Sequence, residues 1–242
     1  LGPSLAAENC DSAGRPDFVA AREFSWQSLI EPENLFWPAY FWYWNGPPTP
    51  DVLRQQLADM AGHEARSVCV VPMPHEFRPV TMNTSMDVDF PKFASSAAHQ
   101  NGTALALTES FGVYGNGLTP AQMKWLVDYQ YVRGLTLLVC GVYPLSTRDH
   151  LMLGERPHFG PVNPLWDFLP YFHRYVARLG YLLSCGKPAI DIGLYYPVRD
   201  LWASADPADA AAHDALARAL LRRQCDFDIV DDDVLSAQPA RV

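Results

Sequence analysis

A single carboxylate, Glu109, stands at the end of a short apolar run and directly before a glycine-rich turn. The apolar residues 104–107 predict a short buried strand, and the glycines within residues 112–117 let the backbone turn tightly and approach a ligand closely. In (β/α) barrels, the acids that do chemistry lie at the C-terminal ends of such strands. On spacing alone two interpretations of Glu109 stay open: a reactive acid, or a strand-end carboxylate that caps the next helix or pairs with an arginine.

The residues after Glu109 predict a strand, helix, strand unit. Thr119, Pro120 and Gln122 form a capping box with proline at the first helical position, so a helix begins there. Gly134 is placed to end that helix, and the apolar residues 135–140 predict the next strand, parallel to the first. The same signals predict further helices from Thr49-Pro50 and Asn163-Pro164, and strands over residues 40–44 and 67–71.

The segment around Glu109 reads Thr108-Glu109-Ser110-Phe111-Gly112-Val113-Tyr114-Gly115, and its likeness to a known family continues through residues 118–120, 123–125 and 131–134. These motifs resemble the α-L-rhamnosidase-like glycoside hydrolases, which are large multidomain enzymes with a TIM-barrel core. Residues 38–46 are similar to the first barrel strand of that group, and residues 155–157 and 160–166 extend the likeness. The resemblance runs from residue 36 to residue 235.

The resemblance implies an α/β fold: an incomplete (β/α)8 barrel of the TIM type over residues 36–188, followed by a partial flavodoxin-like βαβ unit over residues 189–242. Residues 1–35 form the N-terminal tail and lead-in. A full barrel needs about 250 residues, so several β/α units are missing, and the abridgement falls near residues 80–90. A deletion, a gene fragment or an abridged sequence would each explain it. Exposed strand edges predict that such a chain associates and is a weak catalyst by itself.

Glycoside hydrolysis usually requires two carboxyl groups that flank the scissile bond. By the resemblance, Glu109 is the catalytic carboxylate and Glu155 its expected partner, although an ion pair of Glu155 with Arg156 or another arginine is an equal alternative. The family also has acidic residues in the absent segment, so the true partner and any calcium ligands belong there in the other interpretation. Calcium is therefore a cofactor by resemblance alone, and its ligands are unknown. The acidic residues 231–233 predict a solvated turn or, alternatively, a cation site.

Aromatic and polar residues near the predicted strand ends supply a candidate sugar-binding rim. Alternation along the first strand turns Trp42 and Trp44 to one side, which is either the sugar-facing side or, for Trp42, the packed core. A surface His-Glu pair is the alternative for the histidine after the second strand. The candidate substrate-binding residues are Trp42, Trp44, Asn45, His75, Tyr114 and Tyr143.

Composition limits the kinds of partner and location that the sequence favours. A formal charge of -9 without a basic run argues against nucleic acid and is compatible with a carbohydrate substrate. No apolar stretch is long enough to span a membrane, and residues 1–20 lack the pattern of an export signal. Five cysteines without a CxxC spacing indicate free thiols, with Cys69 and Cys140 expected to be buried in strands, which favours a cytoplasmic location. The oligomeric state is open.

These observations favour a glycoside hydrolase, α-L-rhamnosidase-like, with Glu109 as its carboxylate. Two alternatives remain at this point. The first is a non-catalytic carbohydrate-binding remnant that keeps the aromatic rim without a working carboxylate pair. The second is a β-galactosidase-like barrel glycosidase that uses the same glutamate.

Overall fold

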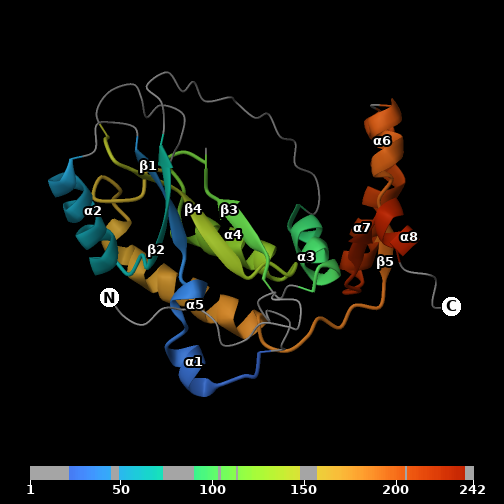
Figure 1. Ribbon diagram of the computed structural model, residues 1–242, viewed down its shortest axis with the longest axis horizontal. Coiled ribbons are helices and arrows are strands. Elements are labelled where there is room, and N and C mark those ends of the chain that lie inside the picture. The colour runs from blue at the N-terminus through green and yellow to red at the C-terminus, as the bar shows by residue number, and fades with distance from the viewer. Residues whose placement is uncertain are drawn as a thin grey trace.

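The computed structural model describes residues 22–44, 49–72, 90–102, 105–112, 114–147, 157–204 and 206–237. The larger part of this description alternates strands and helices along the chain (Figure 1). Its elements are α1 (Trp26–Ile30), η1 (Asn34–Phe36), β1 (Ala39–Trp44), α2 (Pro50–Gly62), β2 (Ser67–Pro72), α3 (Phe90–Gln100), β3 (Leu107–Ser110), α4 (Pro120–Tyr131), β4 (Leu137–Pro144), η3 (Trp166–Phe168) and α5 (Leu169–Leu183). The α/β class is therefore confirmed.

Two helix starts follow the predicted capping chemistry. The Thr49 side chain accepts a hydrogen bond from the backbone N–H of Val52 at the start of α2. Thr119 and Gln122 complete a capping box at the start of α4, and in both helices a proline follows the cap. Both predictions are confirmed.

The third predicted start is wrong. The Asn163 side chain accepts from the backbone N–H of Leu165 and closes a turn there, and a short 3-10 helix, η3, comes before α5 begins at Leu169. An asparagine before a proline was compatible with either a helix cap or a turn, because both place its side-chain oxygen on a nearby backbone N–H.

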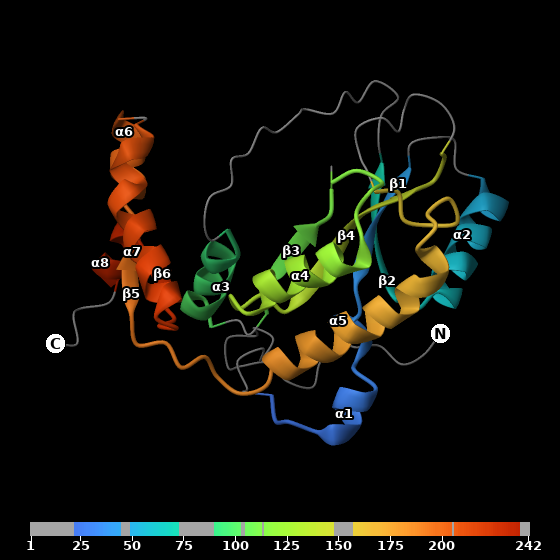
Figure 2. The same ribbon diagram turned by 180° about the vertical axis from the view of Figure 1, so that it is seen from behind.

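The four strands form one parallel sheet in the order β2-β1-β4-β3. The steps from β1 to β2 and from β3 to β4 move in the same direction across this sheet. Right-handed crossovers that move in one direction place their helices on one face. The rule therefore puts α2 and α4 on one face, and α5, which follows β4, runs along the same side of the sheet as α4 (Figure 2).

Hydrogen bonds confirm which strand residues face the helices. Trp42 on β1 donates from its indole to Gln56 of α2, at 2.8 Å, and Ser110 on β3 donates to Gln130 of α4, at 2.9 Å. Tyr40 on β1 is bonded to His173 of α5. We call this side the helix face. Because strand side chains alternate, the other side carries the buried Val139 together with half-buried or exposed residues, and we call it the open face. The half-buried or exposed residues are Ala39, Phe41, Tyr43, Cys69, Leu107 and Glu109.

The register between β1 and β4 contains an irregularity. Tyr40 pairs with Cys140, whereas Trp42 pairs with Tyr143, so β4 has one residue more than β1 over this stretch. Such a bulge turns the residues that follow it to the other side of the sheet. Tyr143 consequently shares the helix face with Trp42.

The cysteine prediction is half right. Cys140 is buried, whereas Cys69 is exposed, because it lies on β2 at the edge of the described sheet. Within the described residues, no helix is long and apolar enough to cross a membrane.

A smaller unit follows α5. Its elements are β5 (Gly193–Tyr195), α6 (Val198–Ser204), η4 (Pro207–Ala210), α7 (Ala211–Arg222), β6 (Asp228–Val230) and α8 (Asp232–Ala237). Strands β5 and β6 are parallel, and Leu194, Ala217, Phe227 and Ile229 form its core.

This unit is joined to α3 by polar contacts. Lys92, almost fully buried, donates to Asp226 at 2.7 Å, and His99 lies 2.9 Å from Asp228. Asp231 caps α8 by accepting from the backbone N–H of Val234. The structure therefore gives Asp231 a capping role, which fits the acidic-turn interpretation of residues 231–233.

The centre of the helix face holds a buried polar pair. The Tyr40 hydroxyl and His173 Nε2 are 2.7 Å apart, and His173 Nδ1 is 2.8 Å from the carbonyl oxygen of His63. A carbonyl accepts only, so Nδ1 carries the proton and Nε2 accepts from Tyr40. Burial, the main cause, lowers the pKa of His173 to about 4. The imidazole is neutral in the folded protein near pH 7.

We predict that acidification destabilises the fold through His173. The unfolded chain binds a proton at this residue near pH 6.5, whereas the folded chain does so only near pH 4. The contribution of His173 to the free energy of unfolding is therefore fully present above pH 6.5. It declines as the pH falls towards 4, by at most about 3 kcal/mol. Urea unfolding at several pH values measures the decline. In His173→Gln, which preserves both hydrogen-bonding capacities, the slope over this window should be smaller; equal slopes would exclude the assignment.

Candidate active site

Glu109 lies where the sequence predicted it, near the C-terminal end of a parallel strand. It is the third residue of β3 and pairs with Val139 of β4. Its neighbour Ser110 points to α4, so the Glu109 side chain is on the open face, and it is exposed. Among the described residues of the four sheet strands, Glu109 is the one acidic residue.

Two glycines leave space for this carboxylate. A Cβ atom placed on Gly141 would lie 3.3 Å from Glu109 Oε1 and 3.5 Å from the Cα atom of Gly112. Any larger side chain at residue 141 would therefore push against the carboxylate. Gly112 belongs to the glycine-rich turn, so the backbone of that turn comes close to Gly141, the residue beside the carboxylate.

Two aromatic rings share the open face with Glu109. Phe41 and Tyr43 stack with ring centroids 6.4 Å apart and an interplanar angle of 30°. Val139 pairs with both Ala39 and Glu109. Ala39 is therefore on the same face as Glu109, and so are the two rings, which alternate with it along β1. These two rings were not predicted from the sequence. The sequence-based expectation put the tryptophans of the same strand on the sugar-facing side, whereas the residues that alternate with them face away from the helices.

The predicted rim residues are not all brought together. Trp42 is buried on the helix face, which corrects its assignment to the sugar-facing side and fits the packing alternative. Tyr143 is also buried on the helix face, so the expectation that it shares a cleft with Glu109 is wrong, and the bulge in β4 is the reason. Tyr114 is 57% exposed in the turn after β3.

The remaining candidates lie at the margin of the description. The backbone of Trp44 ends β1, and its side chain is outside the described residues. Asn45, His75 and Glu155 are outside the described residues altogether. Their roles remain predictions.

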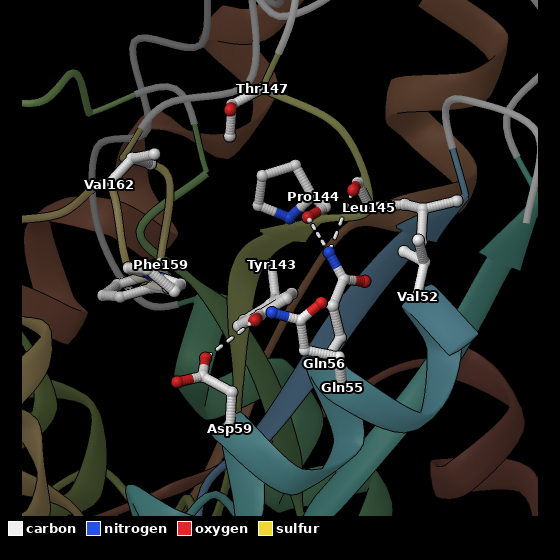
Figure 3. Close-up of a pocket in the computed structure, with 12 residues that line it drawn as sticks. Val52, Gln55, Gln56, Asp59, Tyr143, Pro144, Leu145, Thr147, Phe159 and Val162 are labelled. Carbon is white, nitrogen blue, oxygen red and sulfur yellow. Dashed lines mark hydrogen bonds between the residues drawn. The ribbon is translucent and has the colours of Figure 1, made fainter. Parts of the chain in front are cut away.

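A cavity of about 290 Å³ opens on the helix face, between α2 and the end of β4 (Figure 3). Asp59 lies on its wall and accepts a hydrogen bond from the Tyr143 hydroxyl at 2.8 Å. Gln56 donates to the backbone carbonyl of Leu145 at 2.9 Å and accepts from the Trp42 indole. Burial first, and then the bond to Asp59, raise the pKa of Tyr143 above its ordinary value, so the phenol is neutral and donates.

These polar groups were not predicted. Gln56 and Asp59 on α2 and His63, the residue directly after α2, are spaced three and four residues apart, and such a spacing puts side chains on one face of a helix. That spacing was the available signal. The hydrogen bonds of these side chains are made to other residues of the chain, so we assign them a structural role, which is to hold α2 against the sheet.

No metal site emerges from the described ranges. They contain no group of three or more histidine, cysteine, aspartate or glutamate residues that could hold a metal ion. The described residues therefore do not supply a fit for calcium, and no chemical step is assigned to it.

Comparison with known proteins finds one partial relative to report. The chain is 33% identical over 109 residues to a protein of Formosa agariphila named "Putative beta-glucuronidase". The match covers 43% of this chain and 9% of that protein, so it spans a small part of the relative. No family model and no solved structure matches the chain.

We predict that Tyr143→Phe lowers the free energy of unfolding by about 1 to 3 kcal/mol, because it leaves the half-buried Asp59 carboxylate without its hydroxyl donor. Tyr114→Phe is the matched control, since it removes the same atom from an exposed side chain. Urea unfolding of both variants at pH 7 gives the comparison. Equal stabilities would show that the Tyr143 bond makes no net contribution.

Proposed function

We propose that this chain is a piece of a glycoside hydrolase, α-L-rhamnosidase-like, in which Glu109 is a catalytic carboxylate. The observation that carries the proposal is the position of Glu109, at the end of a parallel strand and on the open face of a sheet whose helices lie on the other side. In a (β/α) barrel, that face is the interior and those strand ends form the catalytic rim.

The strand order supports an incomplete barrel. In a closed (β/α) barrel, each strand pairs with its neighbours in sequence and the last strand pairs with the first. Here β1 pairs with β2, β3 pairs with β4, and the last strand, β4, pairs with β1. The neighbour relation is interrupted between β2 and β3, the same interval in which the sequence predicted missing units near residues 80–90.

The open face supplies two features that a glycosidase needs, a carboxylate and aromatic rings. An aromatic ring packs against the C–H face of a sugar, and Phe41 and Tyr43 are half-buried on that face. The second carboxyl group is assigned to Glu155 or to the absent segment. Trp44 ends β1, Asn45 directly follows it, and His75 comes after β2 in sequence, which supports rim positions for the three residues.

The partial relative supports the broad class. Its name is that of a glycosidase, and the aligned part includes 43% of this chain. The α-L-rhamnosidase-like assignment rests instead on the motif around Glu109. A β-galactosidase-like specificity is the alternative within the same class.

One observation favours a second function. Since Glu109 is the one acidic residue in the described sheet strands, the chain by itself holds one half of a carboxylate pair there. A carbohydrate-binding remnant fits that composition. Release of nitrophenol from the nitrophenyl α-L-rhamnoside, β-D-glucuronide and β-D-galactoside separates an enzyme from a binding protein. The glycoside that is hydrolysed identifies the class of glycosidase.

We predict that Glu109→Gln lowers turnover on the preferred nitrophenyl glycoside by about 10²-fold or more, because a positioned acid or base contributes that much. Glu31→Gln changes an exposed glutamate outside the sheet and is the control. Initial rates at saturating substrate give the comparison. Equal turnover in both variants would remove Glu109 from the mechanism.

We also predict that Tyr43→Ala weakens sugar binding by about tenfold, because it removes a stacking surface worth about 1.4 kcal/mol. Tyr171→Ala removes an equally large ring from the exposed side of α5 and should leave binding unchanged. Calorimetric titration with the free sugar measures both. An effect of the same size in both variants would deny the open face a role in binding.

A further inference from the structure

The cavity between α2 and the end of β4 has polar groups on its wall with hydrogen-bonding capacity beyond what the fold uses. The Tyr143 hydroxyl donates to Oδ2 of Asp59, and the Trp166 indole donates to Oδ1 at 3.4 Å. Each carboxylate oxygen can accept two hydrogen bonds, so Asp59 can accept further donors. Gln55 and Thr147 line the same cavity, and both side chains are exposed. The wall therefore offers a carboxylate, an amide and a hydroxyl to a ligand.

The opposite side of the cavity is apolar. It is formed by the loop over residues 159–162, in which Phe159 is buried and Val162 is 55% exposed. Figure 3 shows both side chains across the cavity from Gln56 and Val52 of α2. A sugar ring has C–H groups on its faces and hydroxyl groups around its edge, so it needs apolar and polar walls of this kind.

The apolar loop is fixed by bonds within the fold. The backbone N–H of Phe159 donates to the carbonyl oxygen of Val142 at 2.8 Å, and the Asn163 side chain donates to the carbonyl oxygen of His158 at 2.9 Å. Gly160 has a φ of +121°, and a Cβ atom there would lie 3.0 Å from the Tyr143 ring. Glycine is what lets the loop pass so close to this ring. A wall that is already in place loses little conformational entropy when a ligand binds.

Charge and size limit the ligand. Asp59 is the one charged residue among the described residues that line the cavity. A phosphate or carboxylate group would meet this carboxylate without a compensating cation, so an anionic ligand is disfavoured. The volume of about 290 Å³ is at the lower end of the range for small-molecule sites, about 300–1,000 Å³. The cavity therefore suits a single ring better than an oligosaccharide.

From these observations we infer that this cavity is a second carbohydrate site, which binds one neutral sugar ring. Asp59, Gln55 and Thr147 bond to its hydroxyl groups, and Val162 packs against its C–H groups. The site is distinct from the open face, because Tyr143 lies on the helix face and Glu109 on the other. The choice of a sugar rests on the glycosidase class proposed above, whereas binding here does not require Glu109.

The test follows the backbone amides of the full chain by NMR during titration with methyl α-L-rhamnoside and methyl β-D-galactoside. At least one of these neutral sugars should cause saturable shifts in the cavity residues 55–59, 144–147 and 159–162. The same shifts should persist in Tyr43→Ala, because that ring lies on the open face. Absence of saturable shifts in the cavity with both sugars would overturn the inference.

Variants on the wall test the contacts. Gln55→Ala and Thr147→Val each remove one bonding group and should raise the dissociation constant about fivefold, as expected for one hydrogen bond. Val162→Trp fills the cavity and should abolish binding there. Gln27→Ala removes an exposed amide from α1 and is the control. The four positions are exposed, and circular dichroism verifies that each variant is folded. Unchanged affinity in all three wall variants would show that the sugar binds elsewhere.

Two charged probes test the ligand class. Methyl β-D-glucuronide should bind in the cavity about tenfold more weakly than the preferred neutral sugar, because its carboxylate meets Asp59. Tighter binding of tetramethylammonium than of either neutral sugar would overturn the carbohydrate assignment in favour of a cation.

Binding and activity fail separately. Sugar binding in the cavity by a chain that hydrolyses none of the nitrophenyl glycosides would support this inference and count against the proposed function. Hydrolysis without sugar binding in the cavity would count against this inference alone.

Discussion

The handedness of the connections between parallel strands is the constraint on which this structure depends. Because the steps from β1 to β2 and from β3 to β4 move the same way across the sheet, right-handed crossovers leave α2 and α4 on one face. Everything else about the candidate site follows from that sorting. The polar groups of β1 and β4 that face the helices form hydrogen bonds within the fold, whereas Glu109 lies exposed on the open face.

The helix face shows how completely its polar groups are used. Tyr40 and His173 bond to each other, and Tyr143 bonds to Asp59. Buried polar groups that are satisfied hold elements in one arrangement, and removing a partner costs more than the bond itself contributes. A tyrosine at the end of a barrel strand can therefore be a structural residue even when its position in sequence suggests a site. The face to which its side chain points decides between the two roles. In β4, one additional residue sets that face.

The sequence allowed some of this to be predicted and not the rest. The starts of α2 and α4 were predictable because a cap and a proline act within one helical turn. Glu109 was predictable because an apolar run and a glycine-rich turn bracket it. The phase of β1 was not, since residues 40–44 are all aromatic and alternation among them has no polar side to mark the outside. The exposure of Cys69 depended on knowing which strand is at an edge.

What the open face can do depends on what encloses it. A carboxylate that protonates a glycosidic oxygen needs a raised pKa, and a raised pKa requires removal from water or a second carboxylate nearby. Glu109 is exposed on the described sheet, and the described sheet strands hold no second acidic residue. The same enclosure that would satisfy the edges of β2 and β3 would also shield this carboxylate from solvent. Strands that pair with these edges would therefore also supply the enclosure that the proposed catalytic role of Glu109 requires.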